Sequence, residues 1–222
     1  MSDESAADPL RAAADTMHEV RERCVWSQQI THRDLVPYLI EESHEVIDAV
    51  ENGSRADLRE ELGDLLWQVL FHAAIAAQDP DDPFDIDDVA ATLTEKMVRR
   101  HPHVFAGEVA STPEEVLVHW NAAKAAEKRT RRSVLDGIPR GMPALALAQK
   151  LVGRAAGVGA VAAPAPGIVE PAASAPATEQ ELGDALLGLV ALAGARGWDA
   201  ERALRERLRA LEDEVREAES GR

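Results

Sequence analysis

Two acidic pairs with the same spacing occur in the first third of the chain. Glu42 and Glu45 are three residues apart, and so are Glu61 and Asp64. Side chains three apart share one face of a helix, so each pair would present two carboxylates together. Oxygen ligands without histidine or cysteine favour Mg²⁺, with Mn²⁺ as an alternative, over zinc. The spacing therefore predicts a divalent-metal site.

Both pairs fall on the apolar side of a predicted helix. Glu42 lies three residues after a leucine and four before a valine, and Glu61 lies between two leucines at the same spacings. Burying four ionised carboxylates without compensation is prohibitive, so they take up protons, face solvent or bind cations. Pairs on two consecutive antiparallel helices favour cation binding, because helical bundles assemble metal sites in this way.

Helical periodicity dominates the rest of the chain and predicts the all-α class. Capping signals mark helix starts at Ser54-Asp57 and at Thr112-Pro113, and Asn52-Gly53 is typical of a helix end. A loop is expected between Cys24 and Ile30. The predicted helices cover 9–23, 31–50, 54–78, 85–100, 113–128, 144–155 and 178–219, the last with a break near Gly197.

The composition changes after residue 156. Residues 157–177 are mainly Ala, Pro, Gly and Val, which is typical of a linker. Glu181 and Asp184 then repeat the second acidic pair, but no acidic helix precedes them, and a capping box with Thr178 explains Glu181 without metal. We therefore expect a catalytic domain over 1–156, a linker over 157–177, and a degenerate, catalytically silent helical half over 178–222.

The overall composition limits the classes of partner. The 222 residues carry a formal net charge of −16, which argues against binding to nucleic acid or to an anionic membrane. The single cysteine, Cys24, fits a reducing cytoplasm. Asp3 and Glu4 stand where a signal peptide would be basic, and no apolar stretch approaches the length of a membrane span. We expect a cytoplasmic protein.

The run Glu41-Glu42-Ser43-His44-Glu45, followed after fifteen residues by Glu61-Leu62-Gly63-Asp64, resembles the EExxE…ExxD signature of the MazG family of nucleoside triphosphate pyrophosphohydrolases. The resemblance covers roughly residues 9–155 and extends weakly over 178–219. Further matching segments are Trp26, Pro37-Tyr38, 60–68, Phe71-His72, 96–105, Trp120, 127–129 and 133–139.

This resemblance implies a four-helix-type bundle that works as a homodimer or a higher homo-oligomer. It implies that Glu42, Glu45, Glu61 and Asp64 are magnesium ligands. Glu41, next to Glu42, could position the attacking water or support the ligands from behind, and its ordinary alternative is an exposed glutamate that pairs with a neighbour. The implied reaction is Mg²⁺-dependent hydrolysis of a nucleoside triphosphate to the monophosphate and pyrophosphate, in the clearance of unwanted or damaged nucleotides.

The resemblance also selects cationic residues that would hold the triphosphate. Lys96 and Arg100 share a helix face, and Arg99 is adjacent; these three residues are the candidate phosphate ligands. The alternative is that they only compensate the dipole at the C-terminal end of their helix. Trp120 and Lys124 form another such pair, in which the indole would stack on a base and the ammonium reach a phosphate. The ordinary alternative is a core tryptophan beside an exposed lysine.

Several residues keep two interpretations. Tyr38 either touches substrate or packs. Trp26 sits where the family usually has Cys-Pro-Trp-Asp, but Cys24-Val25-Trp26-Ser27 lacks the Pro and Asp. His101, His103 and His72 are expected to be structural.

Two alternative functions remain. One is a narrow substrate, either phosphoribosyl-ATP or a modified pyrimidine triphosphate. The other is a non-catalytic regulatory protein that binds nucleotide.

Overall fold

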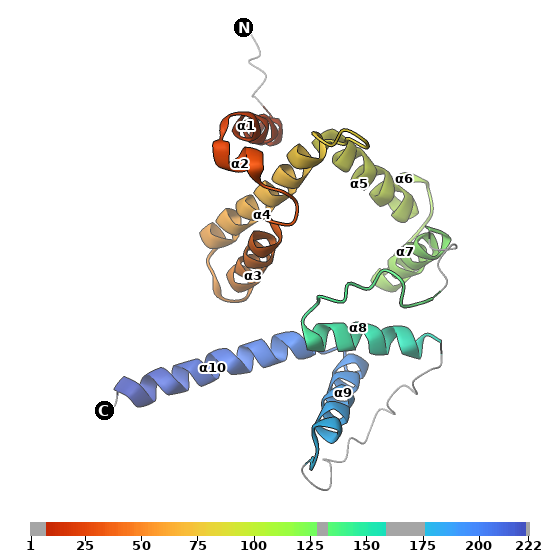
Figure 1. The fold of residues 1–222 in the computed structure, drawn as a ribbon. Helices are drawn as coiled ribbons and strands as arrows, with labels where there is room; N and C mark the ends of the chain where they lie inside the picture. Colours follow the sequence, from red (N-terminus) through yellow and green to blue (C-terminus); the bar gives the residue numbers. More distant parts are fainter. Residues whose placement is uncertain (1–7, 128–132, 159–175, 221–222) are drawn as a thin grey trace. The chain divides into compact units, whose positions relative to one another are not determined.

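The structure, a computed structural model, describes residues 8–127, 133–158 and 176–220. These residues form ten helices and no strand, which confirms the all-α prediction (Figure 1). The chain divides into two compact units, residues 1–127 and 128–222. Within the described ranges, no helix combines the length and apolar character that a membrane crossing requires. The helices are α1 (Pro9–Arg23), α2 (Val25–Gln29), α3 (Val36–Asn52), α4 (Arg55–Ala76), α5 (Ile86–Arg100), α6 (Pro102–Phe105), α7 (Pro113–Glu127), α8 (Ala144–Ala156), α9 (Glu179–Ala195) and α10 (Ala200–Ser220).

A hairpin of α3 and α4 forms the centre of the first unit (Figure 1). Ser54 begins α4 with a capping box, in which its hydroxyl accepts the N–H of Asp57 and the Asp57 carboxylate accepts the N–H of Ser54. Gly53 ends α3 so close to the preceding turn that an added Cβ would lie 2.7 Å from the Cα of Ala49. A glycine is therefore needed where the chain reverses between the two helices.

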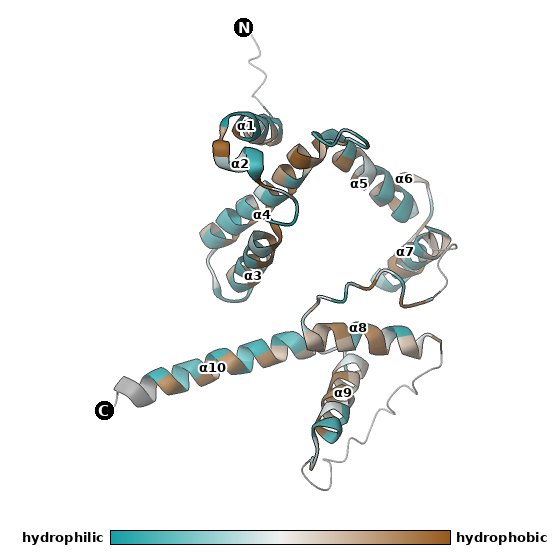
Figure 2. Ribbon diagram, in the orientation of Figure 1, coloured by the Kyte–Doolittle hydropathy of each residue, from teal (hydrophilic) through white to brown (hydrophobic). Residues whose placement is uncertain are grey.

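The core of this unit lies where α1 crosses α4. Met17, Leu35, Leu70 and Phe71 are buried there together. Figure 2 shows that apolar residues gather on the second half of α4, whereas its first half is more polar. The core therefore holds the second half of α4 in place, whereas the polar first half does not contribute to this core.

A buried arginine connects α1 to two other segments. Arg21 is only 7% exposed, and its Nε donates to Oε1 of Gln78 at 2.9 Å. Its Nη1 donates to the carbonyls of Ile30, at 3.0 Å, and Ser27. The predicted loop between Cys24 and Ile30 is wrong in part, because Ser27 donates to the carbonyl of Cys24 and a helical turn, α2, forms.

The helix predicted to start at Thr31 begins later. Thr31 and Asp34 do hydrogen-bond, but they close a turn ahead of α3, which starts at Val36. Pro37 then occupies the first turn of α3, where the missing N–H of proline has no cost.

The second unit contains α8, α9 and α10. Gln149 of α8 donates to the carbonyl of Trp198 at 2.9 Å and accepts the N–H of Ala200 at 3.3 Å, so it binds the turn between α9 and α10. Gly197 has φ +70° in this turn, a left-handed conformation that favours glycine. Since α8 packs on α9, it groups with the second unit, whereas the sequence placed it in the first domain. The predicted linker mostly lies outside the described residues.

Candidate active site

Three of the four predicted metal ligands come together between α3 and α4. Each of Glu42, Glu45 and Glu61 offers one carboxylate oxygen, and these three oxygens lie within 4.8 Å of one another. Glu42 and Glu61 are half-buried and Glu45 is exposed. The antiparallel pairing of α3 with α4 produces this convergence, because both helices aim a glutamate at their shared seam.

Asp64, the fourth predicted ligand, lies one turn beyond Glu61 on α4, outside the group of three. Its negative charge still reaches the cluster. Burial raises the pKa of Glu42, and the charges of Asp64 and Glu45 raise it further. Burial also raises the pKa of Glu61, with added repulsion from Glu45, Glu60 and Asp64. Ionising all of these carboxylates at once is therefore unfavourable in the absence of a cation.

The donor set fits a hard divalent cation. All the converging atoms are carboxylate oxygens, which is the ligand type of Mg²⁺ and Mn²⁺ and differs from the nitrogen and sulfur ligands of structural zinc. Within the described part of the chain, no lysine or arginine forms an ion pair with Glu42, Glu45, Glu61 or Asp64. A bound cation would relieve the repulsion that raises the pKa values of Glu42 and Glu61.

Two further predicted residues lie on α3 beside the cluster. Glu41 is exposed and precedes Glu42, and its charge adds to the repulsion that raises the pKa of Glu42. Tyr38 lies one turn before Glu42 and is 41% exposed. Its ring meets the ring of Trp26 edge-on, with centroids 6.3 Å apart. Trp26 also contacts Phe71 of the core, so this pair is anchored but reaches the surface.

The predicted cations lie on α5 and α7. The guanidinium carbon of Arg100 sits 4.9 Å from the centroid of the Trp120 ring, and the ammonium of Lys124 sits 5.8 Å from the same centroid. Both distances suit cation–π attraction. Two positive groups therefore share one indole, which concentrates positive charge at this place.

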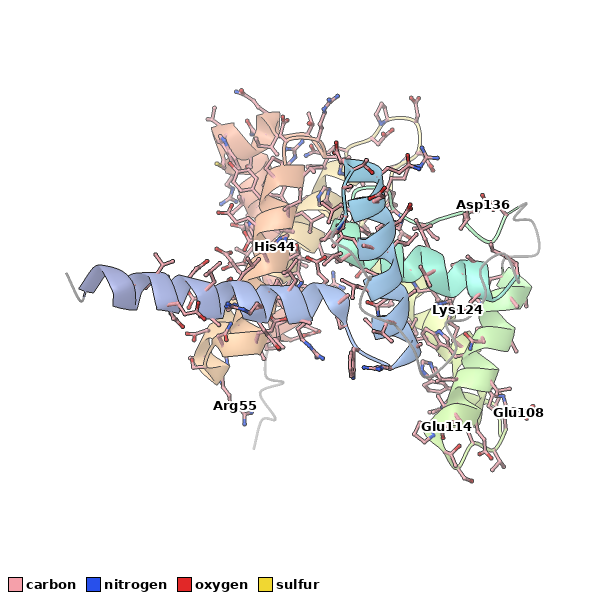
Figure 3. The ribbon with its side chains drawn as sticks, turned by 90° about the horizontal axis from the view of Figure 1, so that it is seen from below. His44, Arg55, Glu108, Glu114, Lys124 and Asp136 are labelled. Carbon is pink, nitrogen blue, oxygen red and sulfur yellow. The ribbon has the colours of Figure 1, made fainter. Side chains whose placement is uncertain are left out.

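Lys96 is half-buried one turn before Arg100 on α5. It lines a hollow of about 430 Å³ with residues that include Phe84 and Leu93. The helix that carries Trp120 and Lys124, α7, packs on α5 and α6, whereas α3 packs on α4. Figure 3 labels His44 on α3 and Lys124 on α7, and the two lie apart. The structure thus places the carboxylates and the predicted phosphate ligands in two separate groups.

One residue near the cations was missed by the sequence interpretation. Glu127 accepts hydrogen bonds from both Arg99 and Arg100, with nitrogen–oxygen distances from 2.5 to 3.2 Å. These hydrogen bonds, that from Arg100 foremost, lower the pKa of Glu127 to about 2. The sequence does contain a signal for Glu127: it lies seven residues after Trp120 and therefore on the same face of α7.

The second acidic motif shows only half of the predicted capping box, because the Glu181 side chain binds the residue before Thr178 and not Thr178 itself. The hydroxyl of Thr178 accepts the N–H of Glu181 at 3.2 Å, and the Glu181 carboxylate accepts the N–H of Ala177 at 2.7 Å. Among the residues that the structure describes, no acidic cluster includes Glu181 or Asp184. Helix capping therefore accounts for Glu181. That this half is catalytically silent remains a prediction.

Comparison with known proteins identifies the family of this chain. Residues 30–105 match the MazG nucleotide pyrophosphohydrolase domain. The chain is 47% identical over 210 residues to an uncharacterized 26.1 kDa protein of Streptomyces cacaoi, covering 95% of this chain and 82% of that protein. It is 50% identical over 153 residues to a nucleoside triphosphate pyrophosphohydrolase of Mycobacterium tuberculosis, covering 69% of this chain but only 46% of that protein.

A third relative is matched over most of its length. The chain is 36% identical over 209 residues to the nucleoside triphosphate pyrophosphohydrolase/pyrophosphatase MazG of Thermotoga maritima, covering 89% of this chain and 80% of that protein. The matched domain, residues 30–105, includes all four carboxylates of the predicted metal site and both Lys96 and Arg100. The chain belongs to the MazG family of nucleotide pyrophosphohydrolases.

Proposed function

We propose that this protein hydrolyses nucleoside triphosphates to the monophosphate and pyrophosphate, with Mg²⁺ or Mn²⁺ held by Glu42, Glu45, Glu61 and Asp64. The observation that carries the proposal is the convergence of three carboxylate oxygens within 4.8 Å, from two helices of a MazG domain. Their mutual repulsion supports the binding of a divalent cation. The bound cation would polarise phosphate oxygens and lower the pKa of a water molecule.

The side chains of this protein would supply the remaining chemistry. The oxygen of water forms a new bond to the α or the β phosphorus, and the anhydride bond between these two phosphorus atoms breaks. The attacking water gives up a proton to the solvent, and the products are the monophosphate and pyrophosphate. Glu41 would orient the water. Lys96, Arg100 and Lys124 would bind the phosphates and stabilise the negative charge on the leaving pyrophosphate. Trp120 would stack on the base, and Tyr38 would line the same site.

We also propose that the active form is a homodimer. Large apolar side chains are exposed along α3 and α4, and packing against a second copy would remove them from water. They include Val36, Leu39, Ile40, Val50, Leu62 and Val69. Within one chain the carboxylates and the cations form separate groups, and a second copy would bring cations to the carboxylates. We propose the cytoplasm as its location and removal of unwanted nucleotides as its role.

The decisive experiment measures the products from canonical and oxidised nucleoside triphosphates at saturating Mg²⁺. We expect a monophosphate and pyrophosphate from at least one substrate, and a loss of at least 100-fold in turnover for Glu61→Ala with the helical circular dichroism spectrum retained. Glu19→Gln, an exposed change on α1, is the matched control and should keep full activity. Full activity of Glu61→Ala, or no turnover of any triphosphate, would contradict the proposal.

The dimer is tested separately. We expect light scattering to give twice the chain mass, with a tetramer as the alternative, and Ile40→Glu to reduce it to the monomer. Mixing inactive Glu61→Ala and Arg100→Ala chains should restore part of the activity if each site draws residues from two chains. A monomeric wild-type protein with full activity would exclude the shared site.

A further inference from the structure

Glu127 makes an unusual contact at the end of α7, because one carboxylate receives two consecutive arginines. Oε1 accepts Nε and Nη2 of Arg99, at 3.0 and 2.8 Å, and also Nε of Arg100 at 3.2 Å. Oε2 accepts Nη2 of Arg100 at 2.5 Å. Both arginines thus present the same edge, Nε with Nη2, to a single anion. Bidentate contacts of this type fix the plane of a guanidinium group.

The two arginines that bind Glu127 differ in how far their side chains are exposed. The side chain of Arg100 is only 15% exposed and lies against the Trp120 ring, whereas that of Arg99 is 53% exposed. Glu127 on one edge and the indole on one face hold the Arg100 guanidinium in place. Within the described ranges its Nη1 has no hydrogen-bond partner, so this nitrogen remains available as a donor.

We propose that Glu127 is a positioning residue, which fixes Arg100 for contact with the triphosphate, and that Arg99 serves to hold Glu127. This inference rests on the proposed function and assigns Arg99 a different role from the phosphate ligand that the sequence suggested. Its mechanism is preorganisation. A free arginine loses side-chain entropy when it is immobilised, and a guanidinium already held in place avoids this loss on binding.

The charge balance supports a remaining anion site. Arg99 and Arg100 carry two positive charges, and Glu127 neutralises one of them. Lys124, which shares the Trp120 ring with Arg100, adds another positive charge and forms no ion pair in the described part of the chain. Two positive charges are therefore left to meet phosphates. The low pKa of Glu127, about 2, keeps its carboxylate ionised at neutral pH.

The test uses Glu127→Ala in the full chain, with two readouts. We expect KM for the triphosphate to rise about 10-fold while kcat changes less, because a mobile Arg100 still reaches the phosphate but must first be ordered. We expect the affinity for a non-hydrolysable α,β-methylene triphosphate with Mg²⁺, measured calorimetrically, to fall by a similar factor. Glu127→Gln, which keeps one acceptor oxygen, should recover part of the loss.

A double-mutant cycle separates positioning from a general structural role. In an Arg100→Ala background, Glu127→Ala should have little further effect on nucleotide affinity, since the residue that it positions is gone. Additive losses, or an unchanged affinity for the α,β-methylene compound in Glu127→Ala, would overturn the inference. Glu114→Ala removes a carboxylate from the first turn of the same helix and is the matched control (Figure 3).

Failure of this inference is distinguishable from failure of the proposed function. The positioning role fails if the wild-type protein turns over triphosphates and the Glu127 variants do so with unchanged KM. The proposed function fails if the wild-type protein releases no pyrophosphate, whatever its affinity for the α,β-methylene compound. An absence of any nucleotide binding by the wild-type protein would overturn both.

Discussion

The Nδ1 atoms of His32 and His72 lie 2.8 Å apart, and their rings are stacked with an interplanar angle of 5°. A hydrogen bond between two imidazole nitrogens requires one ring to donate and the other to accept, so the accepting ring must be neutral. His72 is on α4, and its Nε2 is buried without a partner among the described residues. The pair joins α4 to the turn that precedes α3, at the base of the hairpin that carries the carboxylates.

We predict that this pair makes the fold sensitive to mild acid. Burial lowers the pKa of His72 below its ordinary value of 6.5, and the nearby His32 lowers it further. Below about pH 6.5 the unfolded chain therefore binds more protons than the folded chain, and stability falls as the pH falls. The melting temperature of the wild type should drop between about pH 7 and 5, and that of His72→Gln should drop less. His18→Gln, an exposed change, should follow the wild type; equal slopes for all three would contradict the prediction.

The carboxylate cluster should oppose folding in the absence of metal. We expect Glu45→Gln to raise the melting temperature in EDTA by about 1 to 3 °C, because it removes repulsion from Glu42 and Glu61. In Mg²⁺ the wild type should gain stability, since a ligand that binds the folded state stabilises it, and the variant should gain less. A variant less stable than the wild type in EDTA would show that the cluster is not under repulsive stress.

Arg21 should be essential for stability but not for chemistry. Replacing it with methionine preserves bulk but leaves two carbonyls and Gln78 without their buried donor. We expect a loss of about 2 to 4 kcal/mol in the free energy of unfolding by urea, a typical cost for removing a buried charged donor. Arg23→Met, an exposed change on the same helix, should cost much less. A comparable loss for both variants would mean that the hydrogen bonds of Arg21 are not the cause.

Gly53 should control the geometry of the hairpin. An added Cβ would lie 2.7 Å from the Cα and 2.9 Å from the carbonyl oxygen of Ala49, and both are backbone atoms that cannot rotate away. We expect Gly53→Ala to cost about 1 to 3 kcal/mol of stability and to weaken Mg²⁺ binding measured by calorimetry. Gly63→Ala, where an added Cβ meets nothing within 4 Å, is the matched control and should be neutral or slightly stabilising.

Features that depend only on residues close together in the chain could be predicted without coordinates. Capping boxes, glycine turns and a 3.6-residue period act over a few residues, so the helical class, the hairpin of α3 and α4 and the shared seam of Glu42 and Glu61 could be predicted. The same local reasoning explains why Glu181 could be interpreted as a cap. The exceptions were also local: hydrogen bonds of Ser27 and a proline in the first turn of α3 moved helix boundaries by a few residues.

Contacts between residues far apart in the chain depend on how the helices pack and could not be predicted. Glu127 is 27 residues from Arg100 along the chain, and no periodicity specifies that α7 returns to α5 with this carboxylate beside that guanidinium. The grouping of α8 with α9 and the stacking of His32 on His72 likewise follow from how helices pack. Local pattern fixes which face of a helix is apolar, but the neighbour that covers this face is selected by side-chain fit over the whole unit.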